Sequence, residues 1–314
     1  MAPQLLQHND YTVGWICALW QEQTAAKAML DCIHEDLPQP QSDKNTYTLG
    51  TIAKYNVVIA CLPCGEATHA AAAASSAWMV TTFPSIRFGL MVGIGLPIDQ
   101  FPGVVQWDVG TTQQDGFERS GSLNNPPTLL LRAASKLRTG HDLKGSRIPA
   151  FLEELKTKWP DMTKEYLKRC YNDVLFRADY NHVRYHDQNM EEEKFCQFCD
   201  PDESLSREHR DMRIHYGLIA SGNEVIEDAL SRDKLNRNLG GDLLCVETEA
   251  AGLMNNFLCV VIRGICDYAD PHRNNVWQKH AAAVATAFAK ELLGYVQPYE
   301  VDRERPVWEI VGQG

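Results

Sequence analysis

Two apolar runs in the last third of the chain predict buried strands of a parallel sheet. Residues 243–246 (LLCV) and 258–262 (LCVVI) are four or five residues long and are bounded by polar sequence. Short runs of this kind are typical of strands that are covered on both faces. One short helix is predicted between them. Because parallel strands end at the same edge of a sheet, we expect their carboxyl ends to meet at a ligand-binding crevice.

Acidic residues follow each of these two runs. Glu247 and Glu249 come after the first run, and Asp267 and Asp270 come after the second. Carboxylates a few ångströms apart oppose one another's ionisation, so one of them can keep its proton near neutral pH and act as a general acid. The residues alone also allow a structural alternative, in which Glu249 opens a helix and Asp270 makes a turn before Pro271.

The remaining pattern predicts an α/β protein. Further strands are predicted over residues 11–19, 47–52, 55–62, 88–92 and 214–220, and the second and third of these form a hairpin. Helices are predicted over residues 20–30, 65–84, 128–140, 148–159, 162–176 and 276–296. Residues 100–121 predict strand, turn and strand at the margin of the protein.

The periodic segments predict a single domain over residues 11–296. A ten-residue extension (1–10) precedes it, and a polar tail (297–314) follows. A charged insertion at about 140–213 interrupts the domain, and its apolar positions recur only in one pair of helices. We therefore expect it to lie on the surface rather than to form a second domain.

Charge and composition exclude several classes of partner. The net charge is −11, and the sequence shows no basic stripe, which disfavours nucleic acid and anionic membranes as partners. No apolar run approaches the length of a membrane span, and the N-terminus lacks the pattern of a signal peptide. These features predict a cytoplasmic protein.

Ten cysteines occur, several of them inside apolar runs where they behave as small buried hydrophobes, and this use fits a reducing compartment. Cys196 and Cys199 have metal-ligand spacing, and four histidines lie in the same segment: His182, His186, His209 and His215. One such cysteine pair is half of a zinc site. The alternative is a loop with two free thiols. We predict no metal and keep the pair as candidate ligands.

Gly93 and Gly95 follow the strand predicted over residues 88–92 and allow the backbone to approach a ligand closely. A dinucleotide fingerprint requires a third glycine and a helix directly after it. Residues 96–99 (LPID) provide neither, so we predict no nicotinamide cofactor and no other cofactor.

Five motifs, taken in chain order, resemble the nucleoside phosphorylase and nucleosidase superfamily. They are CALWQE at 17–22, GIG at 93–95, GLIASGNEV at 217–225, VETEAAG at 246–252 and RGICDYAD at 263–270. The likeness covers most of the predicted domain. It is strongest to fungal members that often form the first domain of immune-receptor-like proteins. The resemblance implies a three-layer α/β/α fold with a mixed central sheet, and a homo-oligomer in which a neighbour completes the sugar pocket.

The resemblance also implies roles for individual residues. By likeness to the motifs of methylthioadenosine and S-adenosylhomocysteine nucleosidases, Asp267 protonates the purine, Glu22 activates a water molecule and Glu249 binds the ribose hydroxyls. The remaining residues carried over to the substrate pocket are Ser221, Asn223 and Val225 at the base, together with Glu247, Thr248, Gly93 and Gly95. A proton on the leaving base and carboxylates beside a cationic sugar are what glycosidic cleavage requires.

Water is the nucleophile that this sequence favours. Family phosphorylases carry an arginine just before the glycine motif, where this chain has Met91, and Arg87 lies too early. Glu22 would also repel phosphate. We therefore expect a purine nucleosidase, with phosphate-dependent phosphorolysis as the third candidate.

Three departures from the family pattern support a second candidate of another class. GIGLPID passes almost directly to FPGVVQWDVG, so a strand is missing unless residues 100–107 replace it, and Thr248 stands where the family has methionine. We also expect a free-standing domain with no ATPase or repeat segment after it. The second candidate is a phosphorylase-fold protein that acts on a different small molecule in biosynthesis, or that binds or senses one.

Overall fold

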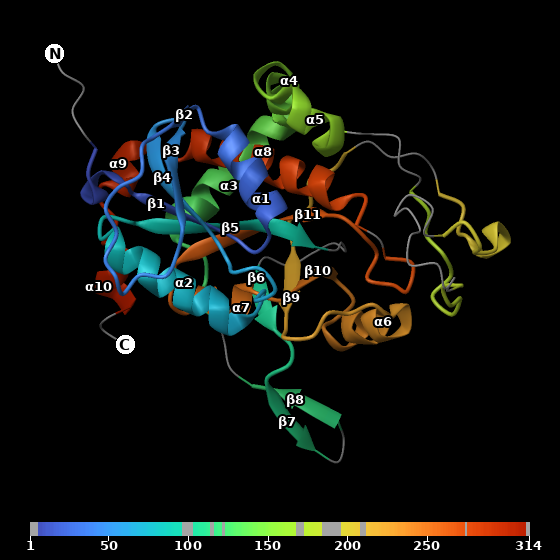
Figure 1. The fold of residues 1–314 in the computed structure, drawn as a ribbon. Helices are drawn as coiled ribbons and strands as arrows, with labels where there is room; N and C mark the ends of the chain where they lie inside the picture. The colour runs from blue at the N-terminus through green and yellow to red at the C-terminus, as the bar shows by residue number, and fades with distance from the viewer. Residues whose placement is uncertain are drawn as a thin grey trace.

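The computed structural model describes residues 6–95, 103–113, 116–120, 123–167, 173–183, 196–207, 212–273 and 275–311. Its centre is a six-stranded sheet (Figure 1). The strand order is β11 (Cys259–Ile265), β5 (Phe88–Gly95), β1 (Val13–Cys17), β4 (Tyr55–Cys61), β3 (Tyr47–Ile52) and β2 (Cys32–Ile33). The first four strands are parallel to one another, and β3 and β2 are antiparallel to their neighbours. The sheet is therefore mixed, as predicted, and the hairpin of β3 and β4 is confirmed.

A second sheet of three parallel strands stands beside the carboxyl ends of the first. It contains β10 (Leu243–Glu247), β9 (Leu218–Ser221) and β6 (Gly103–Gln106). The two apolar runs that we assigned to one parallel sheet therefore lie in different sheets, and that expectation is wrong. Apolar periodicity identifies a buried strand but does not determine its partner. The carboxyl ends of β10 and β11 still lie close together. The ion pair between Arg263 of β11 and Glu247 of β10 shows this.

Part of the stretch proposed to replace the missing strand is a strand. Residues 103–106 form β6, which lies parallel to β9, whereas residues 96–102 are outside the described residues. β7 (Gly110–Gln113) and β8 (Gly116–Arg119) then form an antiparallel ribbon, which projects from the body of the molecule (Figure 1). This ribbon accounts for the strand, turn and strand predicted at the margin.

Helices cover both faces of the large sheet and make the three-layer α/β/α fold that we expected (Figure 1). One face carries α1 (Trp20–Met29), α3 (Thr128–Lys144) and α8 (Gln278–Tyr295), with α4 (Ile148–Lys158) and α5 (Pro160–Tyr166) packed outside them. The opposite face carries α2 (His69–Thr82), α7 (Ala250–Met254) and α10 (Val307–Val311). The small sheet packs against α6 (Ala229–Asn238). The short helices are η1 (His8–Asp10), η3 (Pro201–Glu203) and α9 (Pro298–Val301).

The side chains of β1 show how one strand contributes to both cores. Val13, Trp15 and Cys17 are buried beneath α3 and α8, whereas Ile16 faces the core under α2, because successive side chains of a strand point to opposite faces. Gly14 leaves room for the ring of Phe257, since an added Cβ would lie 2.6 Å from it. The ring that precedes β11 thus packs directly on the backbone of the sheet.

The second helix of the charged insertion is shorter than predicted. α5 ends at Tyr166, whereas the pattern predicted a helix over residues 162–176. Phe176 instead forms an isolated bridge with Ser204 and stacks on His272, with the ring centroids 4.1 Å apart. These tertiary contacts hold Phe176 outside a helix, and no local pattern shows them. The boundaries of the extension, insertion and tail stay predictions.

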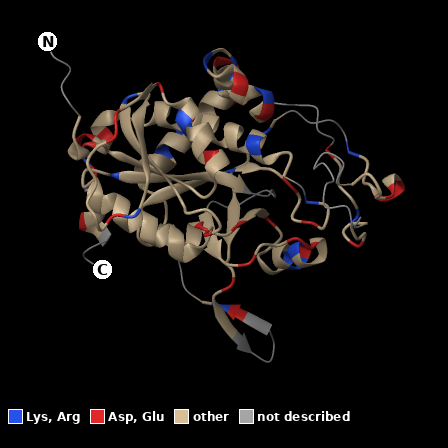
Figure 2. Cartoon of the chain, in the orientation of Figure 1, with Lys and Arg blue, Asp and Glu red and all other residues tan. Residues whose placement is uncertain are grey.

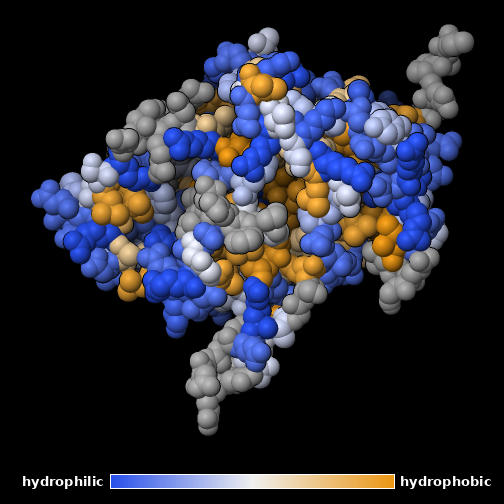
Figure 3. Space-filling view, turned by 180° about the vertical axis from the view of Figure 1, so that it is seen from behind, coloured by the Kyte–Doolittle hydropathy of each residue, from blue (hydrophilic) through white to orange (hydrophobic). Residues whose placement is uncertain are grey.

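Charged and apolar side chains are unevenly distributed over the surface. Basic and acidic residues are interspersed on α4, α5 and α6 (Figure 2). In the view from behind, apolar residues gather near the middle of the face and hydrophilic residues occupy much of its rim (Figure 3). Of the helices in the described ranges, none combines the length and the apolar character that crossing a bilayer would require.

Candidate active site

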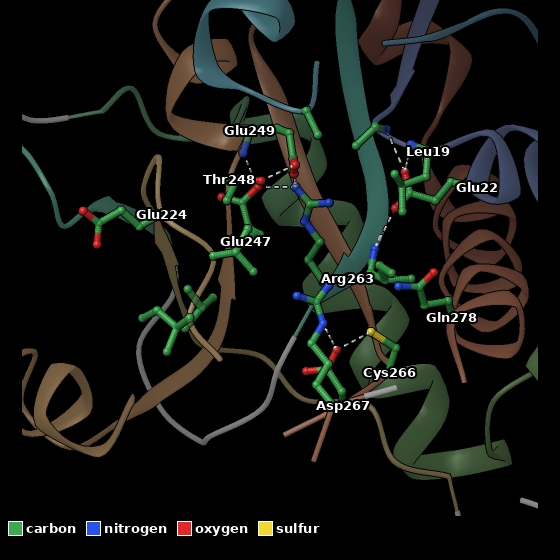
Figure 4. A pocket seen from close by; sticks show the side chains of 17 residues that line it. Leu19, Glu22, Glu224, Glu247, Thr248, Glu249, Arg263, Cys266, Asp267 and Gln278 are labelled. Carbon is green, nitrogen blue, oxygen red and sulfur yellow. Dashed lines mark hydrogen bonds and ion pairs between the residues drawn. The ribbon is translucent and has the colours of Figure 1, made fainter. Parts of the chain in front are cut away.

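A cavity of about 180 Å³ opens where the carboxyl ends of the two sheets meet (Figure 4). Its walls come from segments far apart in the sequence. The lining residues are Ala18, Leu19, Glu22, Ala67, Ile94, Glu224, Val225, Ile226, Val246, Glu247, Thr248, Glu249, Arg263, Cys266, Asp267, Arg273 and Gln278. Most of the residues that the sequence singled out are therefore brought to one place.

Glu22 lies in the first turn of α1 with its side chain turned back toward the strands (Figure 4). Its Oε2 accepts the backbone N–H groups of Ala18 at 2.7 Å and Leu19 at 3.0 Å, and its Oε1 accepts that of Ile94 at 3.0 Å. The first two bonds cap the helix, whose N-cap residue Leu19 has no polar side chain. The third bond connects α1 to the end of β5. Glu22 is thus both a cap and a wall of the cavity.

The surroundings of Glu22 change its acidity. The residue is only 2% exposed. Burial raises its pKa to about 7, an effect that Glu249 strengthens, while Arg263 and the backbone donors oppose it. A carboxyl group with this pKa exchanges its proton close to neutral pH, which is the property of an effective general base.

Arg263 lines the cavity, although the sequence motifs had suggested no role for it. It rises from the middle of β11, where its side chain is 2% exposed, and pairs with Glu247 and with Glu249 Oε2, the latter at 2.9 Å. Burial disfavours its charge, but the two carboxylates outweigh that effect and raise its pKa. It is the only charged residue in the strand sequence CVVIRGI. Because a buried charge requires a partner, a single arginine in an apolar strand indicates a buried ion pair.

Glu247 organises the turn between β10 and α7. Its Oε2 accepts the backbone N–H groups of Glu249 at 3.1 Å and Ala250 at 2.9 Å, in addition to the contact with Arg263. The start of α7 and the guanidinium are therefore held by the same oxygen. Burial raises the pKa of Glu249, against the effect of Arg263.

Gly93 of β5 lies beneath Glu22 and Arg263. An added Cβ would come within 2.2 Å of Arg263 Nη1 and 2.6 Å of Glu22 Oε1. The glycine leaves space for two side chains of the site to pack over the strand, whereas the sequence had suggested space for a ligand. Gly95 lies at the end of the same strand and pairs with Ile265.

We expect Arg263→Met to lower the free energy of unfolding by about 3–5 kcal/mol, because it leaves Glu247 and Glu249 buried without their counter-ion. Chemical denaturation of the purified chain measures this change. Arg237→Met is the matched control, since Arg237 is exposed on α6, and its effect should stay within about 0.5 kcal/mol. Equal stability of the two variants would show that the ion triad contributes nothing to the fold.

Asp267 follows β11 and also lines the cavity (Figure 4). Its Oδ1 accepts the backbone N–H of Ala269 at 3.0 Å, and its Oδ2 accepts the thiol of Cys266 at 3.3 Å. Arg273 Nε lies 3.1 Å from the same Oδ2. These three contacts hold the carboxylate of Asp267 at the wall of the cavity.

The residues proposed to hold the base do not all reach the cavity. Val225 lines it and is 61% exposed. Ser221 is buried behind the wall, where its Oγ accepts the backbone N–H of Ala251 at 2.9 Å. Asn223 is exposed, and its backbone and side-chain N–H groups both donate to Asp108 Oδ2. Ser221 and Asn223 therefore shape the loop that presents Val225.

The candidate metal ligands lie apart from this cavity. Cys196, Cys199 and His182 form a cluster whose ligand atoms all lie within 4.8 Å of one another. Of the other candidate histidines, His215 is not in that cluster, and the remaining two (186 and 209) are outside the described residues. Of the carboxylates that line the cavity, Glu247 and Glu249 pair with Arg263, and Asp267 pairs with Arg273.

Comparison with known proteins supports the fold that the motifs suggested. No family model matches the chain. It is 44% identical over 326 residues, which include 96% of the chain, to a nucleotide-binding leucine-rich repeat (NLR)-like protein of Hyaloscypha variabilis. The chain spans 31% of the length of that relative. This likeness agrees with the resemblance to immune-receptor-like proteins.

Solved structures of nucleosidases share the architecture. The 5′-methylthioadenosine/S-adenosylhomocysteine nucleosidase of Neisseria meningitidis, in complex with methylthio-immucillin-A, has a TM-score of 0.56 at 15% identity over 90% of this chain and 98% of its own. Futalosine hydrolase of Helicobacter pylori has a TM-score of 0.55 at 15% identity, over 91% and 99% of the two chains. The chain therefore has the fold of the nucleoside phosphorylase and nucleosidase superfamily, as the motifs indicated.

Proposed function

We propose that this protein is a nucleosidase that hydrolyses the N-glycosidic bond of a purine nucleoside. The observation that carries the proposal is the convergence of Glu22, Glu249, Arg263 and Asp267 on one cavity. They come from the start of α1, the start of α7, β11 and the loop after β11. The neighbour from Neisseria meningitidis binds methylthio-immucillin-A, which supports a nucleoside-shaped ligand for this fold.

In the proposed reaction each step falls to one side chain. Asp267 donates a proton to the base, so that the electrons of the breaking C–N bond leave on a neutral group. Glu22 accepts a proton from water as the water oxygen bonds to the sugar carbon. The cationic sugar that forms between these events lies among buried carboxylates, which stabilise positive charge in a site of low dielectric.

Glu249 is the proposed acceptor for the sugar hydroxyls. Its Oε2 faces Arg263, and its Oε1 accepts the hydroxyl of Thr248. Each carboxylate oxygen can accept a second hydrogen bond, so a sugar hydroxyl would share Oε1 with Thr248. The same observation favours the second candidate function, a protein that binds or converts a different small molecule, because both oxygens of Glu249 are already engaged within the chain.

Phosphorolysis remains the third candidate. Arg87 is directed elsewhere, since its Nη1 donates to the carbonyl of Glu304 at 2.9 Å. Arg263 lines the cavity, but Glu247 and Glu249 offset its charge. A phosphate dianion would have to bind beside these carboxylates and Glu22, which costs free energy through like-charge repulsion. A water molecule carries no such cost.

The test is to incubate the purified chain with adenosine, inosine, guanosine, uridine and 5′-methylthioadenosine, with and without phosphate, and to measure free base. We expect release of a purine base at a rate that phosphate does not change. Release that requires phosphate would establish phosphorolysis in place of hydrolysis. If the folded protein releases no base from any of these nucleosides, the second candidate replaces the first.

Several expectations from the sequence remain part of this proposal. A cytoplasmic location, a homo-oligomer whose neighbouring subunit completes the sugar pocket, and a reaction without a cofactor stay predictions. The proposed partner is a nucleoside-like small molecule. The cavity is consistent with such a partner, since carboxylates and two arginines line it together with apolar side chains such as Leu19 and Val225.

A further inference from the structure

A second cluster of chemically active side chains lies in the charged insertion. The Sγ atoms of Cys196 and Cys199 and one ring nitrogen of His182 all lie within 4.8 Å of one another. The backbone N–H of Cys199 donates to the carbonyl of Cys196 at 3.1 Å, which closes a turn and places both thiols on the same side. Cys199 is buried, and the other two residues are partly buried.

His272 supplies an independent observation at the same place. The residue is 6% exposed, and within the described ranges neither of its ring nitrogens has a hydrogen-bond partner. Its Nδ1 lies 4.0 Å from Asp270 Oδ2, beyond hydrogen-bond distance. Its ring centroid is 5.5 Å from that of His182, and its carbonyl oxygen is 4.0 Å from Cys196 Sγ. Buried imidazole nitrogens without partners are costly unless a ligand uses them.

We propose that His182, Cys196 and Cys199 bind one Zn²⁺ ion and that His272 completes a tetrahedral site. Two thiolates separated by two residues, together with imidazole nitrogens, are the donors that structural zinc prefers. Ligand atoms around one zinc ion lie about 3.3–3.8 Å apart. The three atoms within 4.8 Å therefore need only small side-chain rotations to reach that spacing. His272 is not among the atoms that lie this close, so its ring has to turn from its stack on Phe176 to bring in a nitrogen that otherwise has no partner.

The site would join the insertion to the loop that carries Asp267. His272 precedes Arg273, which contacts Asp267. The same loop already contacts the insertion through Tyr268, whose hydroxyl donates to Asp173 and accepts from Arg207. A zinc ion would add a cross-link at this contact. Closing a loop by a metal stabilises the folded state and releases protons from the thiols.

The test measures metal rather than activity, so its outcome is independent of the proposed nucleosidase function. The full chain, purified without chelator, should contain about one zinc ion per chain. After the zinc is stripped, added Co²⁺ should produce the visible bands of tetrahedral cobalt and a sulfur-to-cobalt charge-transfer band. Cys196→Ser/Cys199→Ser should lose both the zinc and the charge-transfer band. Cys32→Ser/Cys64→Ser is the matched control, because both thiols are exposed, and it should keep both.

His272→Phe tests the fourth ligand while keeping an aromatic ring against Phe176. We expect its zinc affinity to fall at least tenfold in a competition titration with a chromogenic chelator. Unchanged affinity would remove His272 from the site. The absence of zinc from the purified chain, with no tetrahedral cobalt spectrum after titration, would overturn the whole proposal. Recovery of a disulfide between Cys196 and Cys199 with no metal would do the same and would identify a redox pair.

Discussion

Replacing Asp267 by Asn is expected to lower the rate of base release by about 10²–10⁴-fold, the usual contribution of a positioned general acid. Asparagine keeps the size of the side chain and an acceptor oxygen for the backbone N–H of Ala269, so the loop after β11 should keep its shape. It has no acidic proton to give to the base. A base that leaves as an anion is a poor leaving group, and the loss should therefore appear in kcat.

The matched control for this variant is Asp161→Asn. Asp161 lies on α5 with its side chain 91% exposed, far in the sequence from any residue that lines the cavity. Its rate should equal that of the wild-type chain. Thermal unfolding of both variants shows whether the fold is preserved. If folded Asp267→Asn turns over at nearly the wild-type rate, Asp267 has no part in the chemistry.

Glu22 is expected to control the acid limb of the pH profile. Its pKa is raised to about 7 by burial, and a general base acts only in its ionised form. The ionised fraction falls about tenfold for each pH unit below the pKa, so kcat/KM should decline with a slope of one below about pH 7. Measuring base release between pH 5 and about pH 9 tests this.

Glu22→Gln should remove that limb and lower kcat by about 10²–10⁴-fold. The amide oxygen of glutamine can still accept the N–H groups of Ala18 and Leu19, but its NH₂ group meets the N–H of Ile94, so some stability should be lost as well. Glu154→Gln on α4, where the side chain is exposed, is the control with the same chemical change. A Glu22→Gln variant that stays folded and keeps the wild-type pH profile would exclude Glu22 as the base.

Much of the site could be found from short patterns along the chain. The acidic residues after two apolar runs, Glu247, Glu249 and Asp267, were visible because buried strands are periodic and because polar residues mark their carboxyl ends. Glu22 was assigned to the site only by the motif resemblance, because its place in the first turn of a predicted helix also fits stabilisation of the helix dipole. These four side chains line one cavity, which agrees with the motif resemblance.

Arg263 was overlooked because it directly follows the apolar run 258–262 and because no local pattern shows its partners. Apolar periodicity predicts the strand but assigns no role to a charged residue at its end. In the structure the guanidinium of Arg263 pairs with both Glu247 and Glu249. Ser221 and Asn223 are not among the residues that line the cavity. Their motif placed them at the base, but Ser221 is turned toward the backbone of Ala251 and Asn223 toward Asp108.

The amino-acid sequence by itself determined the α/β class, most strands and helices, and the acidic character of the site, because these depend on local periodicity and on residue type. Tertiary structure alone decided that β10 and β11 belong to different sheets, that Gly93 makes room for Glu22 and Arg263, and that His272 comes to lie beside a cysteine pair. The partners of strands and of buried charges depend on the free energy of packing the whole chain. A short window of neighbouring residues cannot reveal that free energy.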